Sequence, residues 1–245
     1  MRDLAILVPS RGRPGSVARL VSACEQTCAT DWQLCFAFDD NDPELDASKR
    51  AAGSSYVWTG PRQGLAAWTN TMWSDLRSEF ACFASVGDDH IPKTQAWDKH
   101  LTGALDAHGG GFAYCWNGHH QETPNYPEMC VISAPILAAL GWMAHPSMAH
   151  YCIDVVWLDL GHEAGCLYYL PEVELYHDHW MFPDASAPRD GTYWDAMERG
   201  HDDVRAHEVW RAGQMAADVA TVKAAVAGMK GEGPCPTGTG KPGTG

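Results

Sequence analysis

The first half of this chain alternates between short apolar runs and stretches in which apolar residues recur at helical spacing. Residues 4–8, Leu-Ala-Ile-Leu-Val, form the kind of continuous aliphatic run that fills a strand buried on both faces. Val17, Leu20 and Cys24 then follow at the spacing of one helix face. The same patterns predict strands at 34–38, 54–59, 82–86, 112–116, 129–133, 167–170 and 173–176, and helices at 64–76, 97–105, 136–140, 151–160 and 204–227.

Strands that alternate with helices in this way predict an α/β fold. We expect a single Rossmann-like domain with a mostly parallel central sheet flanked by helices, and a less regular second half that forms the other wall of a cleft. Residues 117–127 are polar, rich in His and interrupted by Pro, which predicts a loop that can line a substrate pocket. Residues 231–245 are nearly all Gly, Pro, Thr and Lys, a composition that predicts a disordered tail.

Acidic or mixed polar clusters follow three of the predicted strands, at 39–42, 88–90 and 177–179. Ligands of open α/β sheets bind at the carboxyl ends of strands, so we expect the clusters to share one site. Asp88, Asp89 and His90 offer hard oxygens and one imidazole nitrogen, a set that suits Mg²⁺ or, better, Mn²⁺. A metal there would neutralise the charge of a diphosphate. The alternative is a solvated turn, because Gly-Asp-Asp is common turn chemistry.

Composition and charge limit the classes of protein to which this chain can belong. The chain has 245 residues, 45% of them hydrophobic, which is enough for a full core. A formal charge of −14 argues against binding of nucleic acid through a broad electropositive surface, although it is compatible with a local basic groove. Nine cysteines without a CxxC pair favour reduced, buried thiols over disulfides or a zinc site. No apolar run approaches the ~20 residues of a membrane span, so we expect a cytoplasmic protein.

The order and spacing of several motifs resemble those of GT-A fold glycosyltransferases, especially the family 2 type, over about residues 4–180. The segments that carry this resemblance are 6–11, 36–40, 62–70, 88–90, 131–142 and 153–158. Asp-Asp-His at 88–90 takes the place of the family's Asp-x-Asp metal motif, as a variant that also occurs in GT-A enzymes. The sequence departs from the family at Ile153, where the family has Glu, and lacks the Arg that usually follows a few residues later.

The resemblance implies one GT-A-like glycosyltransferase domain over residues 1–230. Its nucleotide-binding half would span about 1–92 and its acceptor half about 93–200, with a C-terminal helix at about 204–227 and the tail beyond.

The resemblance also implies roles for individual residues. Contacts to the nucleotide sugar are expected from Pro9, Ser10, Arg11, Asp39, Arg62, Asp88 and Asp89. Arg11, Arg13 and Arg62 stand in predicted loops next to the site, where they can make charge-assisted bonds to phosphate, and a role in surface solubility is the alternative. The metal ligands are expected to be Asp88, His90 and His177, with His179 as the alternative to His177. Asp154 takes the place of the base that accepts the proton of the acceptor hydroxyl, and capping of its helix is the alternative role.

The function implied is metal-dependent transfer of a sugar from a nucleotide-sugar donor, most often a UDP-sugar in such folds, to an acceptor hydroxyl. The compact, Trp- and Ala-rich, Lys-poor chain resembles small glycosyltransferases of phages, some of which modify bases in phage DNA. A hydroxylated base in DNA is therefore one acceptor, and protein, glycan and small-molecule acceptors stay open. A nucleotidyltransferase of similar fold and a catalytically inactive GT-A-like binding module are the alternative functions.

Overall fold

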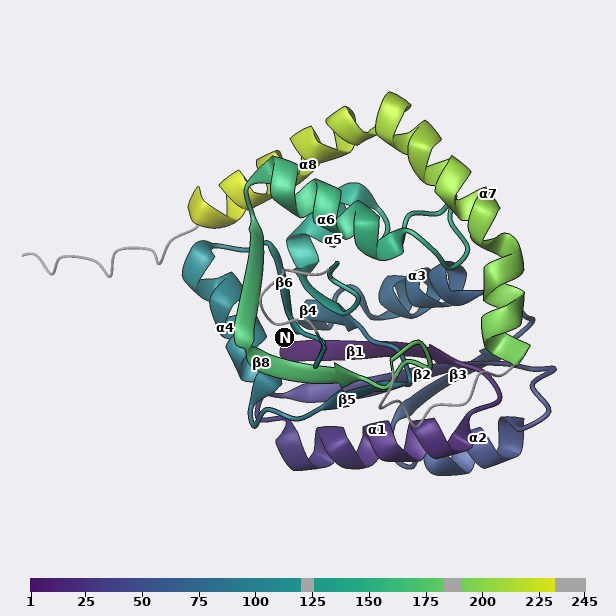
Figure 1. Ribbon diagram of the computed structural model, residues 1–245. Coiled ribbons are helices and arrows are strands. Elements are labelled where there is room, and N and C mark those ends of the chain that lie inside the picture. The colour runs from purple at the N-terminus through teal and green to yellow at the C-terminus, as the bar shows by residue number, and fades with distance from the viewer. Residues whose placement is uncertain (120–125, 183–190, 232–245) are drawn as a thin grey trace, which may run out of the picture.

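A central sheet lies between layers of helices in the computed structural model, which describes residues 1–119, 126–182 and 191–231 (Figure 1). Within these residues the strands follow the order β3-β2-β1-β4-β7-β6-β8-β5. The strands are β1 Arg2–Ser10, β2 Trp32–Asp39, β3 Tyr56–Gly60, β4 Phe80–Ser85, β5 His90–Pro92, β6 Phe112–Trp116, β7 Cys130–Ser133 and β8 Leu167–His177. The helices are α1 Pro14–Thr27, α2 Leu45–Ala51, α3 Leu65–Leu76, α4 Trp97–His108, α5 Ala134–Leu140, α6 Ile153–Ala164, α7 Gly191–Gly213 and α8 Met215–Gly231.

The sheet is mixed, so the prediction of a mostly parallel sheet is wrong. β1 does pair in parallel with β2 and β4, and β2 with β3, as the strand–helix alternation predicts. β7, however, runs antiparallel to both β4 and β6. It follows β6 with no helix among the described residues between them, and a strand that returns directly beside its predecessor runs antiparallel. The strands that precede β5 in the chain thus pair with one another in parallel, whereas the later strands pair in both directions, since β6 and β8 are parallel.

The apolar run in β1 forms a strand because helices cover both of its faces. Leu4, Ile6 and Val8 pack into one core cluster with residues of α1 and α4. Ala5 and Leu7 point the other way, into the cluster that includes α3, α5 and α6. All five side chains are fully buried. The two helical layers of Figure 1 thus account for the absence of a polar residue at positions 4–8 of β1.

Five elements differ from the predicted ones. The strands predicted at 167–170 and 173–176 are one strand, β8, whose register shifts where it passes the end of β6. The single helix predicted at 204–227 is two helices, α7 and α8, which meet at residue 214. α2 and β5 were not predicted, since α2 buries only Ser48 and β5 has three residues.

Parts of two predictions fall where the structure describes nothing. Residues 120–125 of the predicted 117–127 loop, and the predicted tail from residue 232 on, lie outside the described residues. Across the described part of the chain, no helix combines the length and apolarity that crossing a membrane requires.

Candidate functional site

The polar clusters predicted at strand ends meet along one edge of the sheet. β1 ends at Ser10, its neighbour β2 ends at Asp39, and Asp88 follows β4 on the other side of β1. Ser10 Oγ donates a hydrogen bond to Asp88 Oδ2, and Arg11 Nη1 lies 3.0 Å from Asp39 Oδ2. The structure therefore brings together side chains that the sequence places in three separate segments.

Asp88 is buried and both of its oxygens have partners within the protein. Oδ2 accepts from Ser10, and Oδ1 accepts from Arg13 Nη1 at 3.2 Å. Burial and the neighbouring carboxylate of Asp89 raise the pKa of Asp88 to about 6, against the opposing effect of Arg13 and Ser10. The guanidinium of Arg13 also lies 3.7 Å from Asp89. Arg13, for which the sequence left open a phosphate contact or a surface role, thus lies against two carboxylates of the candidate site.

Asp39 is held from two sides. Trp68 Nε1, from α3, donates to Asp39 Oδ1 at 2.8 Å in a buried hydrogen bond. The guanidinium groups of Arg11 and Arg62 lie 3.0 and 3.8 Å from Asp39 Oδ2. An indole and two cations therefore fix one carboxylate at the end of β2. The periodicity of α3 indicates that Trp68 is buried but not that its ring nitrogen faces this carboxylate.

A second cluster, formed by Asp89, His90 and His177, has the composition of a metal site. One potential ligand atom from each residue lies within 4.8 Å of the others. β5 and β8 place the two histidines opposite each other in register, and their rings stack with centroids 4.1 Å apart. Asp89 Oδ1 is 3.5 Å from His90 Nδ1 and 3.5 Å from His177 Nε2. We call these three residues the Asp–His–His cluster.

Two observations test whether this cluster fits a divalent cation. His90 Nε2 is buried and has no hydrogen-bond partner among the described residues, a state that a bound ligand would relieve. A Cβ on Gly87 would lie 2.6 Å from Asp89 Oδ1 and 2.7 Å from His90 Nδ1, so the turn needs glycine to let both side chains fold over it. One carboxylate and two imidazoles suit a divalent transition metal, a class that includes Mn²⁺. The cluster therefore fits the metal that the sequence predicts, with Asp89 rather than Asp88 as the carboxylate in reach.

The charges of the cluster are strongly coupled. Burial alone would lower the pKa of His177, but hydrogen bonds to Asp89 and Glu128 raise it to about 10. Burial and the positive charge of His177 lower the pKa of His90. Asp89 is buried, yet hydrogen bonds to the two histidines hold its pKa well below the usual range. Without metal, a proton on His177 thus supplies the positive charge that the carboxylates attract.

His179, the alternative ligand in the sequence, lies beside the cluster. Its ring centroid is 5.0 Å from that of His177, and its backbone N–H donates to His177 O at 2.8 Å. Burial and the charge of His177 lower its pKa to about 4. His177, not His179, therefore belongs to the cluster.

Asp154 lies in the first turn of α6, one residue after the helix begins at Ile153. Its Oδ1 accepts a 2.9 Å hydrogen bond from the N–H of Val155. Burial raises the pKa of Asp154, and the negative charge of Glu128 adds to the rise although the Val155 bond opposes it. Asp154 thus shares an electrostatic environment with the residues around His177. The N-cap of α6 is Cys152, so Asp154 does not occupy the capping position that was its alternative role.

The segment that leads into α6 is held by a side chain from α7. Asp203, buried with 3% exposure, accepts hydrogen bonds from the backbone N–H groups of Ala149, His150 and Tyr151 at 2.7, 2.9 and 2.7 Å. Cys152 follows in the left-handed conformation, at φ 64°. α7 therefore sets the point at which α6 begins. The sequence gives no periodic signal for this contact.

Pro9, the remaining predicted contact, lies in β1 and is partly exposed. Glu128 and Asn117 are site residues that the sequence analysis missed. Glu128 directly follows Pro127, the end of the polar loop predicted to line a pocket. That adjacency is the only signal in the sequence that points to it.

The geometry can be compared with solved structures, although no family model and no curated protein matches the sequence. The mannosyltransferase PcManGT from Pyrobaculum calidifontis, solved with GDP-Man and Mn²⁺, is 14% identical with a TM-score of 0.56, covering 96% of this chain and 79% of its own. Glucosyl-3-phosphoglycerate synthase from Mycobacterium tuberculosis, solved with Mn²⁺, UDP and phosphoglyceric acid, is 13% identical with a TM-score of 0.59, covering 86% and 79%.

A third similar structure is S. aureus TarS 1–349 in complex with UDP. It is 10% identical with a TM-score of 0.55, and the match covers 71% of this chain and 60% of the TarS chain. This chain therefore spans about 60% of the length of that TarS fragment. At 10–14% sequence identity these three structures show a similarity of fold only. The fold they share with this chain is a GT-A-type α/β fold.

Proposed function

We propose that this protein is a metal-dependent, family 2-like glycosyltransferase that moves a hexose or related sugar from a UDP-sugar to an acceptor hydroxyl. The observation that carries the proposal is the Asp–His–His cluster at the strand ends of a GT-A-type fold, beside Asp88 and Arg13. The neighbouring structures that were solved with Mn²⁺ and UDP or GDP-Man support the same function.

The proposed metal ligands are Asp89 Oδ1, His90 and His177 Nε2. Asp88 is proposed to face the ribose instead, because Ser10 and Arg13 already occupy its oxygens and orient it. A bound Mn²⁺ or Mg²⁺ would supply a Lewis acid that stabilises the charge of the departing diphosphate. Arg11, Arg13 and Arg62 would add positive charge around the phosphates. Asp39, fixed by Trp68, is proposed to accept from the base or the ribose.

Asp154 is the proposed general base for the acceptor hydroxyl. Its raised pKa, caused by burial, brings the carboxylate closer to the working pH and makes it a stronger proton acceptor. We expect Asp154→Ala to abolish sugar transfer and to leave UDP binding intact. Glu163→Gln, an exposed change near the end of the same helix, is the matched control.

The acceptor that we propose to test first is a hydroxylated base in phage DNA, on the compositional resemblance to small phage glycosyltransferases. Protein, glycan and small-molecule hydroxyls form the other arms of the same assay. The formal charge of −14 predicts that a DNA acceptor would be bound through contacts close to the acceptor base and not along a long stretch of duplex.

Calorimetric titration of UDP with and without Mn²⁺ tests the proposal, followed by a hydrolysis screen of nucleotide sugars. We expect Mn²⁺-dependent UDP binding, slow cleavage of one UDP-sugar and loss of both in Asp89→Asn. Binding of UDP without cleavage or transfer would favour a binding module. Turnover of nucleoside triphosphates with sugar phosphates would favour a nucleotidyltransferase. Absence of nucleotide binding under all conditions would refute the proposed function.

A further inference from the structure

Glu128 sits directly behind the proposed ligand His177. Glu128 Oε2 accepts a 2.8 Å hydrogen bond from His177 Nδ1, because an ionised carboxylate has no proton to donate. The same oxygen accepts from Asn117 Nδ2 at 3.1 Å. The carboxylate is 27% exposed, so most of its surroundings are protein. One oxygen of Glu128 therefore joins the polar loop to the Asp–His–His cluster.

This contact decides which nitrogen of His177 faces the cluster. With Nδ1 turned toward Glu128, Nε2 lies on the side of Asp89, 3.5 Å from Oδ1. A proton kept on Nδ1 leaves the lone pair of Nε2 available for a cation, since neutral imidazole carries a proton on only one nitrogen.

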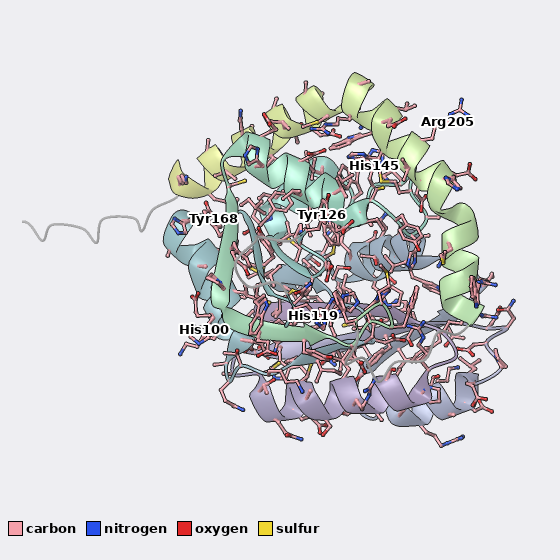
Figure 2. The ribbon with its side chains drawn as sticks, viewed as in Figure 1. His100, His119, Tyr126, His145, Tyr168 and Arg205 are labelled. Carbon is pink, nitrogen blue, oxygen red and sulfur yellow. The ribbon has the colours of Figure 1, made fainter. Side chains whose placement is uncertain are left out.

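The backbone of His177 is fixed by the same loop. Its N–H donates to Asn117 O at 2.9 Å, and its carbonyl oxygen lies 2.8 Å from His119 Nε2. His119 lies beside β8 in Figure 2, and its ring stacks on Phe182 with centroids 3.4 Å apart. The residues around 117–119 thus hold the main chain while Glu128 holds the ring.

We propose that Glu128 is a positioning residue that fixes the tautomer and ring orientation of His177, so that Nε2 faces a divalent cation. The inference rests on the proposed function, which supplies the metal. Metal-bound histidines commonly donate their second N–H to a carboxylate, and loss of that partner weakens metal binding by about 10–100-fold. Glu128 thereby supports the metal site from the segment directly before β7, without touching the cation.

The test is a Mn²⁺ titration followed by the electron paramagnetic resonance signal of free Mn²⁺, without donor or acceptor. We expect Glu128→Ala to raise the Kd for Mn²⁺ by about tenfold or more. Glu128→Gln keeps an oxygen that accepts from Nδ1–H, so its Kd should stay closer to wild type than to Glu128→Ala. Glu172→Gln, an exposed change on β8, is the matched control and should leave the Kd unchanged.

Each result separates this inference from the proposed function. If Glu128→Gln weakens binding as much as Glu128→Ala, the effect of Glu128 is its charge alone and positioning is refuted. If wild type binds Mn²⁺ and Glu128→Ala binds it equally well, the inference fails while the glycosyltransferase proposal stands. If wild type binds no Mn²⁺, the metal-dependent function fails and takes the inference with it. Thermal unfolding of each variant checks that the fold is retained.

Discussion

Asp203 offers the sharpest test of how the C-terminal helices support the site. Asp203→Ala removes the acceptor of three backbone N–H groups, those of Ala149, His150 and Tyr151. Hydrogen bonds to charged groups contribute about 1.5–3 kcal/mol each. Ala149 and His150 are only half-buried and Tyr151 is exposed, so water can take the place of Asp203 for part of the lost hydrogen bonding. We therefore expect the free energy of unfolding to fall by about 3 kcal/mol.

Urea denaturation followed by tryptophan fluorescence measures this loss by linear extrapolation. Asp202→Ala, an exposed change at the adjacent position, is the matched control and should stay within about 0.5 kcal/mol of wild type. Asp203→Ala should also lower the rate of sugar transfer more than Mn²⁺ or UDP affinity, because the loop leads to Cys152 and Asp154. Equal stability of the two variants would refute the argument that Asp203 holds this loop.

Two further predictions concern the strand-end residues and the cluster. Trp68→Phe keeps a buried ring but removes the donor to Asp39, so calorimetry should show UDP binding weakened by about tenfold with Mn²⁺ affinity unchanged. Trp73→Phe on the same helix removes an indole N–H that has no partner within the described residues and should leave UDP binding as it is. In EDTA, His177 should stabilise the metal-free fold fully below pH 6.5, the ordinary pKa of a histidine in an unfolded chain, and lose that contribution as pH rises through its folded pKa of about 10. Urea melts from pH 6 to 10 should show this decline in wild type and a flatter profile in His177→Gln; equal slopes would contradict the assigned ion pairs.

The sequence predicted well those elements whose burial is visible in a few adjacent residues. β1 is an unbroken aliphatic run because both of its faces are covered, and α3 shows a clear apolar stripe. The direction of β7 was missed because its four residues look the same in a parallel or an antiparallel pair. α2 was not predicted because its one buried residue is polar and its sequence shows no apolar stripe.

The residues of the candidate site also fall into those that the sequence predicts and those that only the tertiary structure shows. Residues at strand ends, such as Asp39 and Asp88, could be named because an apolar run points to the end of each strand. Trp68, the partner of Asp39, and Glu128, the partner of His177, could not be named, since each reaches the site only through tertiary packing. The choice between Asp88 and Asp89 as a metal ligand likewise depends on Ser10 and Arg13, whose hydrogen bonds are tertiary contacts.

The length of β8 has a consequence for how the molecule assembles. One end of this strand pairs with β6 inside the main sheet, and the other end pairs with β5 and carries His177 to His90. Contacts between segments so distant in the chain form slowly, because a long loop must close first. A nascent chain that stops before β8 would therefore already hold Asp89 and His90 but would lack their third partner, so the proposed cation site would be completed only after β8 has been synthesised and paired.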